Sequence, residues 1–170
     1  MAGIKASILV LVLALGAGAV RAADAPAAPD HLIAADKGVI QAPIYGMPVS
    51  LDAARKMAEA ARAKATSMGV PGFSIAIVSP DGSLVLFERS DATTYVSIEF
   101  AMSKARTAAI ARRATGPAPD GSMTTPAPDL IALPGGFPII AGGRTIGGIG
   151  VSGTEGADVA IAKAALAAVK

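Results

Sequence analysis

The chain has 170 residues, of which 52% are apolar and only 16% are charged, and its net charge at neutral pH is +2. This length is enough for one domain with a single hydrophobic core and short appendages, and the apolar content excludes a disordered chain. The small net charge, without a basic run interleaved with aromatic residues, argues against nucleic-acid binding. Because the chain contains no cysteine, it has no disulfides, thiolate metal sites or cysteine nucleophile.

The first 22 residues have the pattern of a secretory signal peptide. Lys5 precedes an apolar run from Ala6 to Val20, and the segment ends in the small residue Ala22. The run is shorter than the roughly 20 apolar residues that a membrane-spanning helix requires. We therefore expect cleavage after Ala22, export of the mature chain to the periplasm or the medium, and no stable membrane insertion after cleavage.

Residues 23–49 form a proline-rich segment without helical or strand periodicity. We expect this tail to be flexible, or ordered only against another surface. It contains His31, the single histidine of the chain and therefore the one imidazole available as a metal ligand. The folded domain is expected to comprise residues 50–170.

The domain is predicted to begin with a helix and a hairpin. Ser50 is a good N-cap for an amphipathic helix that Gly69 ends. Two β-rich runs follow, residues 73–79 and 84–89, and they flank the turn sequence Pro80-Asp81-Gly82. This arrangement predicts two antiparallel strands.

The second half of the domain repeats this order. A second helix is predicted over about residues 94–113, followed by a long proline-rich loop. Two or three strands are expected from Leu130 onwards, with a hairpin that turns at Gly142-Gly143, and a closing helix over residues 155–169. Hairpins separated by helices favour an α+β fold, in which helices cover an antiparallel sheet.

Two short motifs lack the context that their usual functions require. Gly148-x-Gly150-x-x-Gly153 matches the dinucleotide-binding fingerprint, but only 17 residues follow Gly153, too few for further βαβ units and the acidic residue that completes the fingerprint. We interpret these glycines as allowing a close backbone approach and a tight strand exit. The pair Glu155-x-x-Asp158 has the spacing of solvated or helix-capping carboxylates.

Lys104 stands out because it lies among small apolar residues of the second helix. The residues that share its helical face are Phe100, Thr107, Ala108 and Ala111. The ammonium either extends to solvent at the helix edge or points into a pocket, where a desolvated lysine binds an acid or acts as a base. Because this face offers no carboxylate, we expect Lys104 to matter more for ligand binding than for folding. Arg106 faces another side of the helix.

Three blocks occur together in the order seen in a known family: IAIVSPDGSLVLFERSD, AMSKARTAAIARRATG and LPGGFPIIAGGRTIGGIGVSG, followed by Asp158. Together they resemble the GlcG/HbpS family of small heme-binding or "heme-degrading" domains, which is also similar to the C-terminal domain of PduO-type proteins. The resemblance covers about residues 50–170. It implies profilin-like α/β/α layers with a mainly antiparallel five-stranded sheet, and a homo-oligomer between a dimer and an octamer. The alanine-rich helix faces also favour close contacts between subunits.

The resemblance also implies a ligand pocket. Its residues would be Lys104, Arg106, Thr107, Gly135, Gly136 and Ser152. Heme is the candidate cofactor, with Lys104 or Arg106 anchoring its propionates. The side chains available as axial iron ligands are His31, Tyr45, Tyr95 and Met102.

Two functions follow from these observations. The first is an exported oligomer that binds heme or a related tetrapyrrole through a basic pocket. The second is a cofactor-independent lyase or isomerase that acts on a small carboxylate or phenolic compound, with Lys104 as the base and Arg106 as the anion clamp. A separate, third interpretation is a binding module that presents a ligand to a membrane sensor.

Overall fold

The structure is a computed structural model that describes residues 44–117, 121–122, 128–154 and 156–169. The predicted signal peptide and His31 lie outside the described residues, as does most of the proline-rich tail. Within the described residues, no helix is both long and apolar enough to cross a membrane.

The helices and strands follow the predicted order. They are α1 (Leu51–Ser67), β1 (Ser74–Val78), β2 (Leu84–Arg89), α2 (Tyr95–Ala111), β3 (Gly136–Ala141), β4 (Arg144–Ser152) and α3 (Asp158–Ala167). The Ser50 hydroxyl accepts a hydrogen bond from the Ala53 backbone N–H at 3.2 Å, as expected of an N-cap. The predicted α+β class is therefore confirmed.

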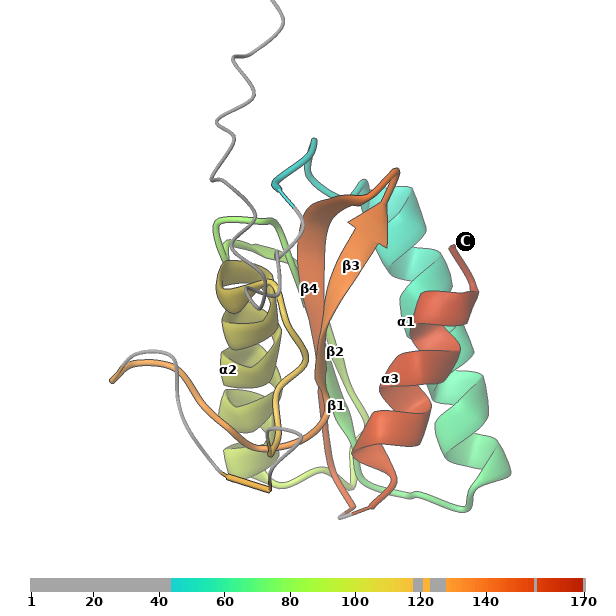
Figure 1. The fold of residues 1–170 in the computed structure, drawn as a ribbon. Helices are drawn as coiled ribbons and strands as arrows, with labels where there is room; N and C mark the ends of the chain where they lie inside the picture. Colours follow the sequence, from blue (N-terminus) through green and yellow to red (C-terminus); the bar gives the residue numbers. More distant parts are fainter. Residues whose placement is uncertain (1–43, 118–120, 123–127, 155, 170) are drawn as a thin grey trace, which may run out of the picture. The chain divides into compact units, whose positions relative to one another are not determined.

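The strands form one antiparallel sheet in the order β2-β1-β4-β3. Figure 1 shows α2 on one face of this sheet and α1 with α3 on the other, which confirms the α/β/α layers. The described sheet has four strands rather than five. Residues 130–135, before β3, add no further strand; the Ile131 backbone N–H donates to the Thr107 hydroxyl of α2 at 2.9 Å instead of pairing with the sheet.

The two faces of the sheet carry different cores because side chains alternate along a strand. On β1, Ile75 and Ile77 belong to the larger core that α1 and α3 cover. Ala76 and Val78 face α2 and join a smaller cluster that is rich in alanine. The α2 face is therefore built from small side chains.

Glycines of β4 let α2 lie unusually close to the sheet. A Cβ atom at Gly148 would lie 2.3 Å from the Ala105 carbonyl oxygen, and one at Gly150 would lie 2.1 Å from the Ala101 carbonyl oxygen. Gly153, directly after β4, makes a similar close approach to the segment before β1: a Cβ atom there would lie 2.3 Å from the Gly72 carbonyl oxygen. The interpretation of these glycines as sites of close backbone approach is confirmed, and the result brings α2 directly against β4.

The last residues of the predicted tail are part of the fold. The segment Ile44–Val49 hydrogen-bonds to β4, with Thr145 N–H donating to Ile44 O at 2.7 Å and Val49 N–H donating to Ile146 O at 2.7 Å. The Tyr45 hydroxyl donates to the Ile110 carbonyl near the end of α2 at 2.9 Å. The folded region of the described chain therefore begins before residue 50.

We predict that Gly150→Ala destabilises the domain by about 1–3 kcal/mol, the usual range for overpacking a close contact. The added methyl group must displace the α2 backbone, which is rigid. Urea unfolding followed by circular dichroism measures the loss. Gly142→Asn is the control, because that glycine has open space around it and asparagine tolerates its left-handed φ of +54°. Equal stabilities of wild type and Gly150→Ala would contradict the close packing.

Candidate functional site

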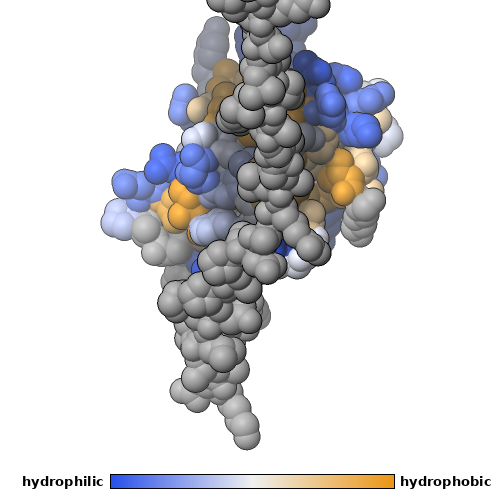
Figure 2. Space-filling model, turned by 90° about the horizontal axis from the view of Figure 1, so that it is seen from above, coloured by the Kyte–Doolittle hydropathy of each residue, from blue (hydrophilic) through white to orange (hydrophobic). Residues whose placement is uncertain are grey.

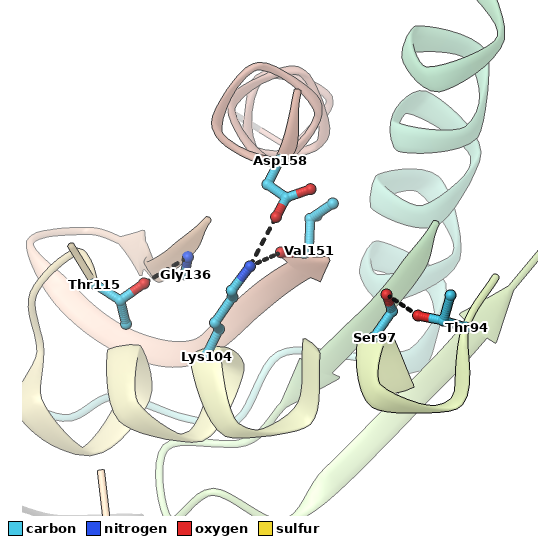
Figure 3. A network of polar contacts seen from close by, with 7 residues as sticks. All are labelled: Thr94, Ser97, Lys104, Thr115, Gly136, Val151 and Asp158. Atoms are coloured by element: carbon cyan, nitrogen blue, oxygen red, sulfur yellow. Dashed lines mark hydrogen bonds and ion pairs between the residues drawn. The ribbon is translucent and has the colours of Figure 1, made fainter. Parts of the chain in front are cut away.

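Lys104 is buried, with only 3% of its surface exposed. Its ammonium donates to the Val151 carbonyl oxygen at 2.9 Å and to Asp158 Oδ2 at 2.7 Å. Figure 3 shows the side chain reaching from α2 past the end of β4 towards Asp158 on α3. The interpretation that Lys104 extends to solvent at the helix edge is therefore wrong.

Asp158 is the carboxylate partner of Lys104, and it comes from α3 because the helical face of Lys104 on α2 carries no carboxylate. It is the first residue of α3, and its side chain is 14% exposed. Burial raises the pKa of the Asp158 carboxyl above its usual value, whereas Lys104 and the nearby Gly153 backbone N–H oppose this rise. Oδ1, the second oxygen, is buried and has no well-formed hydrogen bond within the described part of the chain. The expectation that Lys104 has no structural partner is corrected.

A pocket of about 500 Å³ lies over this ion pair. Its lining residues are Phe100, Lys104, Leu133, Pro134, Ser152, Gly153, Gly156, Asp158 and Val159. The side chains of Phe100, Leu133, Pro134 and Val159 make its walls apolar. Among the described residues of this lining, Lys104 and Asp158 are the only ionisable ones, so this part of the pocket combines apolar walls with one buried ion pair.

The Gly135-Gly136 turn fits closely against the ion pair. Gly135 has a φ of +112°, and a Cβ atom there would lie 2.7 Å from the Val151 carbonyl oxygen and 3.3 Å from Lys104 Nζ. A Cβ atom at Gly136 would lie 2.5 Å from the Lys104 carbonyl oxygen. Neither position has room for a side chain, so these glycines shape the site without offering functional groups.

The structure brings together only some of the residues predicted for the site. Lys104 and Ser152 line the pocket, and Gly135 and Gly136 adjoin it. The Arg106 side chain is exposed and lies against Gly82 in the turn between β1 and β2, apart from the pocket lining. Thr107 is buried and accepts the Ile131 hydrogen bond, so its hydroxyl holds a loop.

None of the predicted iron ligands that the structure describes lines this pocket. His31 lies outside the described residues. Tyr45 hydrogen-bonds near the other end of α2, while Tyr95 and Met102 are exposed on α2 and do not line the pocket. In the described residues, no group of three or more His, Cys, Asp or Glu side chains is placed to hold a metal ion.

Sequence reasoning missed the role of Asp158. It assigned the Glu155-x-x-Asp158 pair to solvated or capping carboxylates, yet Asp158 is largely buried and pairs with a lysine 54 residues away. One signal in the sequence could have indicated this role. The helical face of Lys104 has no carboxylate, and a buried lysine then needs an acid from another helix or strand.

The fold and the site define a small α/β/α domain with an antiparallel sheet and an apolar pocket over a buried ion pair. Residues 49–167 match the model of the family described as "Haem degrading protein HbpS-like". GlcG from Escherichia coli K12 is 37% identical over 84 residues, which span 46% of this chain and 63% of GlcG. The chain therefore belongs to the HbpS-like family, which confirms the resemblance found in the sequence.

Solved structures agree with this assignment. A double mutant of HbpS from Streptomyces reticuli is 28% identical with a TM-score of 0.66, over 87% of this chain and 99% of that chain. The structure of a PduOC:heme complex is 26% identical with a TM-score of 0.65, over 73% of this chain and 96% of that chain.

We predict that Lys104→Met lowers the free energy of unfolding at about pH 7 by about 3 kcal/mol, because it leaves Asp158 buried without its cation. Urea unfolding measures the loss. Lys56→Met, on the exposed side of α1, is the control and should change stability by less than about 0.5 kcal/mol.

The loss caused by Lys104→Met should depend on pH. A carboxyl whose native pKa is raised binds its proton more tightly when folded, so its contribution to stability decreases as pH rises through the native pKa. Because Lys104 opposes the rise of this pKa, its removal lets Asp158 take up a proton at a higher pH than in wild type, and the loss should shrink as the pH is lowered from about 7 to about 4. Equal losses at both pH values would contradict the assignment of Asp158 as the buried partner.

Proposed function

We propose that the pocket binds a ligand with an apolar, planar body and a carboxylate, and that heme or a related tetrapyrrole is the first candidate. The observation that carries this proposal is the buried ammonium of Lys104 at the base of an apolar pocket. A volume of about 500 Å³ falls within the range of ligand sites, about 300–1,000 Å³. The HbpS-like family and the relative solved as a heme complex support the choice of ligand.

The lining residues fit the organic part of such a ligand. Phe100, Leu133 and Val159 offer apolar contacts to a ring, and Lys104 offers a charge-assisted hydrogen bond to a carboxylate. Bound heme would supply a redox-active iron. Iron in heme proteins is usually held by His, Met, Tyr or Cys, and no such residue is present in the described lining. The proposal therefore rests on the ring and its carboxylates and not on iron coordination.

The geometry supports binding more than catalysis by a lysine base. The Lys104 ammonium donates to both Val151 and Asp158, so a role as base would require these two hydrogen bonds to be rearranged. Arg106, which the enzyme hypothesis needs as an anion clamp, does not line the pocket. A lyase or isomerase that acts on a small carboxylate or phenolic compound stays the alternative, and it requires Lys104 to lose a proton to a neighbouring group.

We predict that hemin and metal-free protoporphyrin bind with similar affinity, because the carboxylates and the ring provide the contacts. Lys104→Met should weaken both by about 1.5–3 kcal/mol, the scale of a hydrogen bond to a charged group. Absorbance and fluorescence titrations measure the affinities.

Two further variants make this titration specific. Leu133→Asp places a repelling charge on an exposed part of the pocket wall and should weaken binding without unfolding the domain. Lys56→Met is the matched control and should bind as wild type does. Wild-type affinity in both Lys104→Met and Leu133→Asp would place the ligand elsewhere.

We also propose that the mature chain is exported. The supporting observation is the pattern of Lys5, the apolar run from Ala6 to Val20 and the small residue Ala22, which lies outside the described residues. N-terminal sequencing of the protein purified from its native host should find a chain that begins near Ala23. An intact Met1 would contradict export through a cleaved signal peptide.

We propose that the domain forms a homo-oligomer, although not through the alanine-rich faces that suggested it. Those faces are buried inside the domain, as Ala61 and Ala105 illustrate. The supporting feature is instead the exposed pair Tyr95 and Met102, which are seven residues apart and so share a side of α2. Figure 2 shows hydrophobic residues among hydrophilic ones on both sides of the grey residues. Light scattering should detect an oligomer at micromolar concentration, and a monomer would contradict the proposal.

A further inference from the structure

The single cation in the described pocket lining already has a carboxylate partner. Lys104 Nζ lies 2.7 Å from Asp158 Oδ2, so the charges of the described lining residues sum to zero. A ligand carboxylate that reaches Lys104 would therefore share one ammonium with Asp158. Two carboxylates this close repel each other, and in such a pair the pKa of one is strongly raised.

Asp158 has few other groups that would stabilise its negative charge. The start of α3 favours one carboxylate, which is Asp158 itself. The end of β4 and the Gly135 turn present backbone and uncharged side chains to it. On α3, Lys163 is exposed and lies over the Phe137 ring. Glu155 lies outside the described residues.

The face that α1 turns towards α3 is also uncharged. Its buried residues are Ala54, Met57, Ala58, Ala61 and Ala65. The ionisable residues of α1 lie off this face; they are Asp52, Arg55, Lys56, Glu59, Arg62 and Lys64. No described group near Asp158, apart from Lys104, is therefore placed to neutralise a second negative charge in the pocket.

We propose that the pocket binds a carboxylate together with one proton, and that Asp158 is the residue that takes up the proton. The ligand carboxylate becomes the charged partner of Lys104. Neutral Asp158 then donates its O–H to the ligand or keeps a weaker hydrogen bond to Lys104. The proton comes from solvent, and no covalent bond other than the O–H bond is formed or broken. This inference rests on the proposed function, since it concerns the same site and a ligand with a carboxylate.

The proposal makes Asp158 a specificity-determining residue. At a pH where Asp158 is charged in the free protein, the Lys104–Asp158 pair favours ligands with neutral polar groups. An anionic ligand binds only if Asp158 takes up a proton at the same time. By linkage, the dissociation constant of a carboxylate should rise about tenfold per pH unit above the Asp158 pKa of the free protein. An uncharged ligand of the same shape should show no such dependence.

Isothermal titration calorimetry with sodium benzoate tests the proposal. Benzoate has one carboxylate and a ring that suits the apolar walls, and benzamide is its uncharged counterpart. Titrations near neutral pH in phosphate and in imidazole buffers, which differ in ionisation enthalpy, give the number of protons taken up per ligand. We expect about one proton for benzoate and none for benzamide.

Asp158→Asn identifies the group that takes up the proton. The amide is close to the carboxyl in size, so we expect this variant to fold, which circular dichroism checks. Proton uptake with benzoate should fall close to zero, and the affinity should exceed that of wild type near neutral pH. If the variant does not fold, the number of protons taken up by wild type decides the question by itself.

The outcomes separate this inference from the function on which it rests. Benzoate that binds wild type without proton uptake would overturn the inference and leave carboxylate binding intact. The same uptake in Asp158→Asn as in wild type would overturn the assignment to Asp158. If benzoate binds neither protein at any pH, while hemin binding is also insensitive to Lys104→Met, both the inference and the proposed function are wrong.

Discussion

An ion pair between Lys104 and Asp158 connects the two helical layers of this domain around the end of the central strand β4. Lys104 belongs to the helix on one face of the sheet, and Asp158 begins the helix on the other. The pair exists because glycines at positions 148 and 150 let α2 lie directly against β4, which brings Lys104 to the strand end. A buried ion pair adds little net stability, because desolvation offsets much of its attraction, but removing one partner leaves an uncompensated charge. The pair is therefore a weak source of stability and a strong constraint on the arrangement around the pocket.

Much of the fold could be predicted from local sequence. The Ser50 cap, the turn at Pro80-Asp81-Gly82 and the glycine-rich last hairpin act over a few residues, and the helices and hairpins that they predict are present. The lack of a further strand in residues 130–135 could not be predicted, because Ile131 there hydrogen-bonds to Thr107 on the distant helix α2. The start of the fold was misplaced for a similar reason, since the segment Ile44–Val49 is held by contacts with distant residues of β4.

The site was predictable only in part. Lys104 was identified because its helical face is apolar, and the turn glycines came from the family resemblance. Asp158 was missed because its partner is 54 residues away and its own neighbourhood resembles a helix cap. Arg106 was included by resemblance, although its position on the helix directs it to the turn between β1 and β2. Helical periodicity predicts which residues share a face, whereas it does not predict what another element places opposite that face.

The pairing of Lys104 with Asp158 distinguishes this pocket from a basic site in which the cation is unpaired. A lone lysine would attract any anion, whereas a lysine already paired with a buried acid discriminates by the proton that an anion must bring. Under the proposal, the apolar walls would select the body of a ligand and the ion pair would respond to its charge. The described lining contains no usual axial ligand of heme iron, so the proposal concerns the ring and the carboxylates of a ligand and not its iron.

The most direct test of this account is a crystal structure of the protein with bound 4-bromobenzoate, because anomalous scattering from bromine locates the ligand without ambiguity. The account predicts bromine among Phe100, Leu133 and Val159, with the carboxylate about 3 Å from Lys104 Nζ. The Asp158 carboxyl should lie beside the ligand carboxylate or turn away from Lys104. Bromine at another place, with the contact between Lys104 and Asp158 unchanged, would contradict the assignment of this pocket as the ligand site.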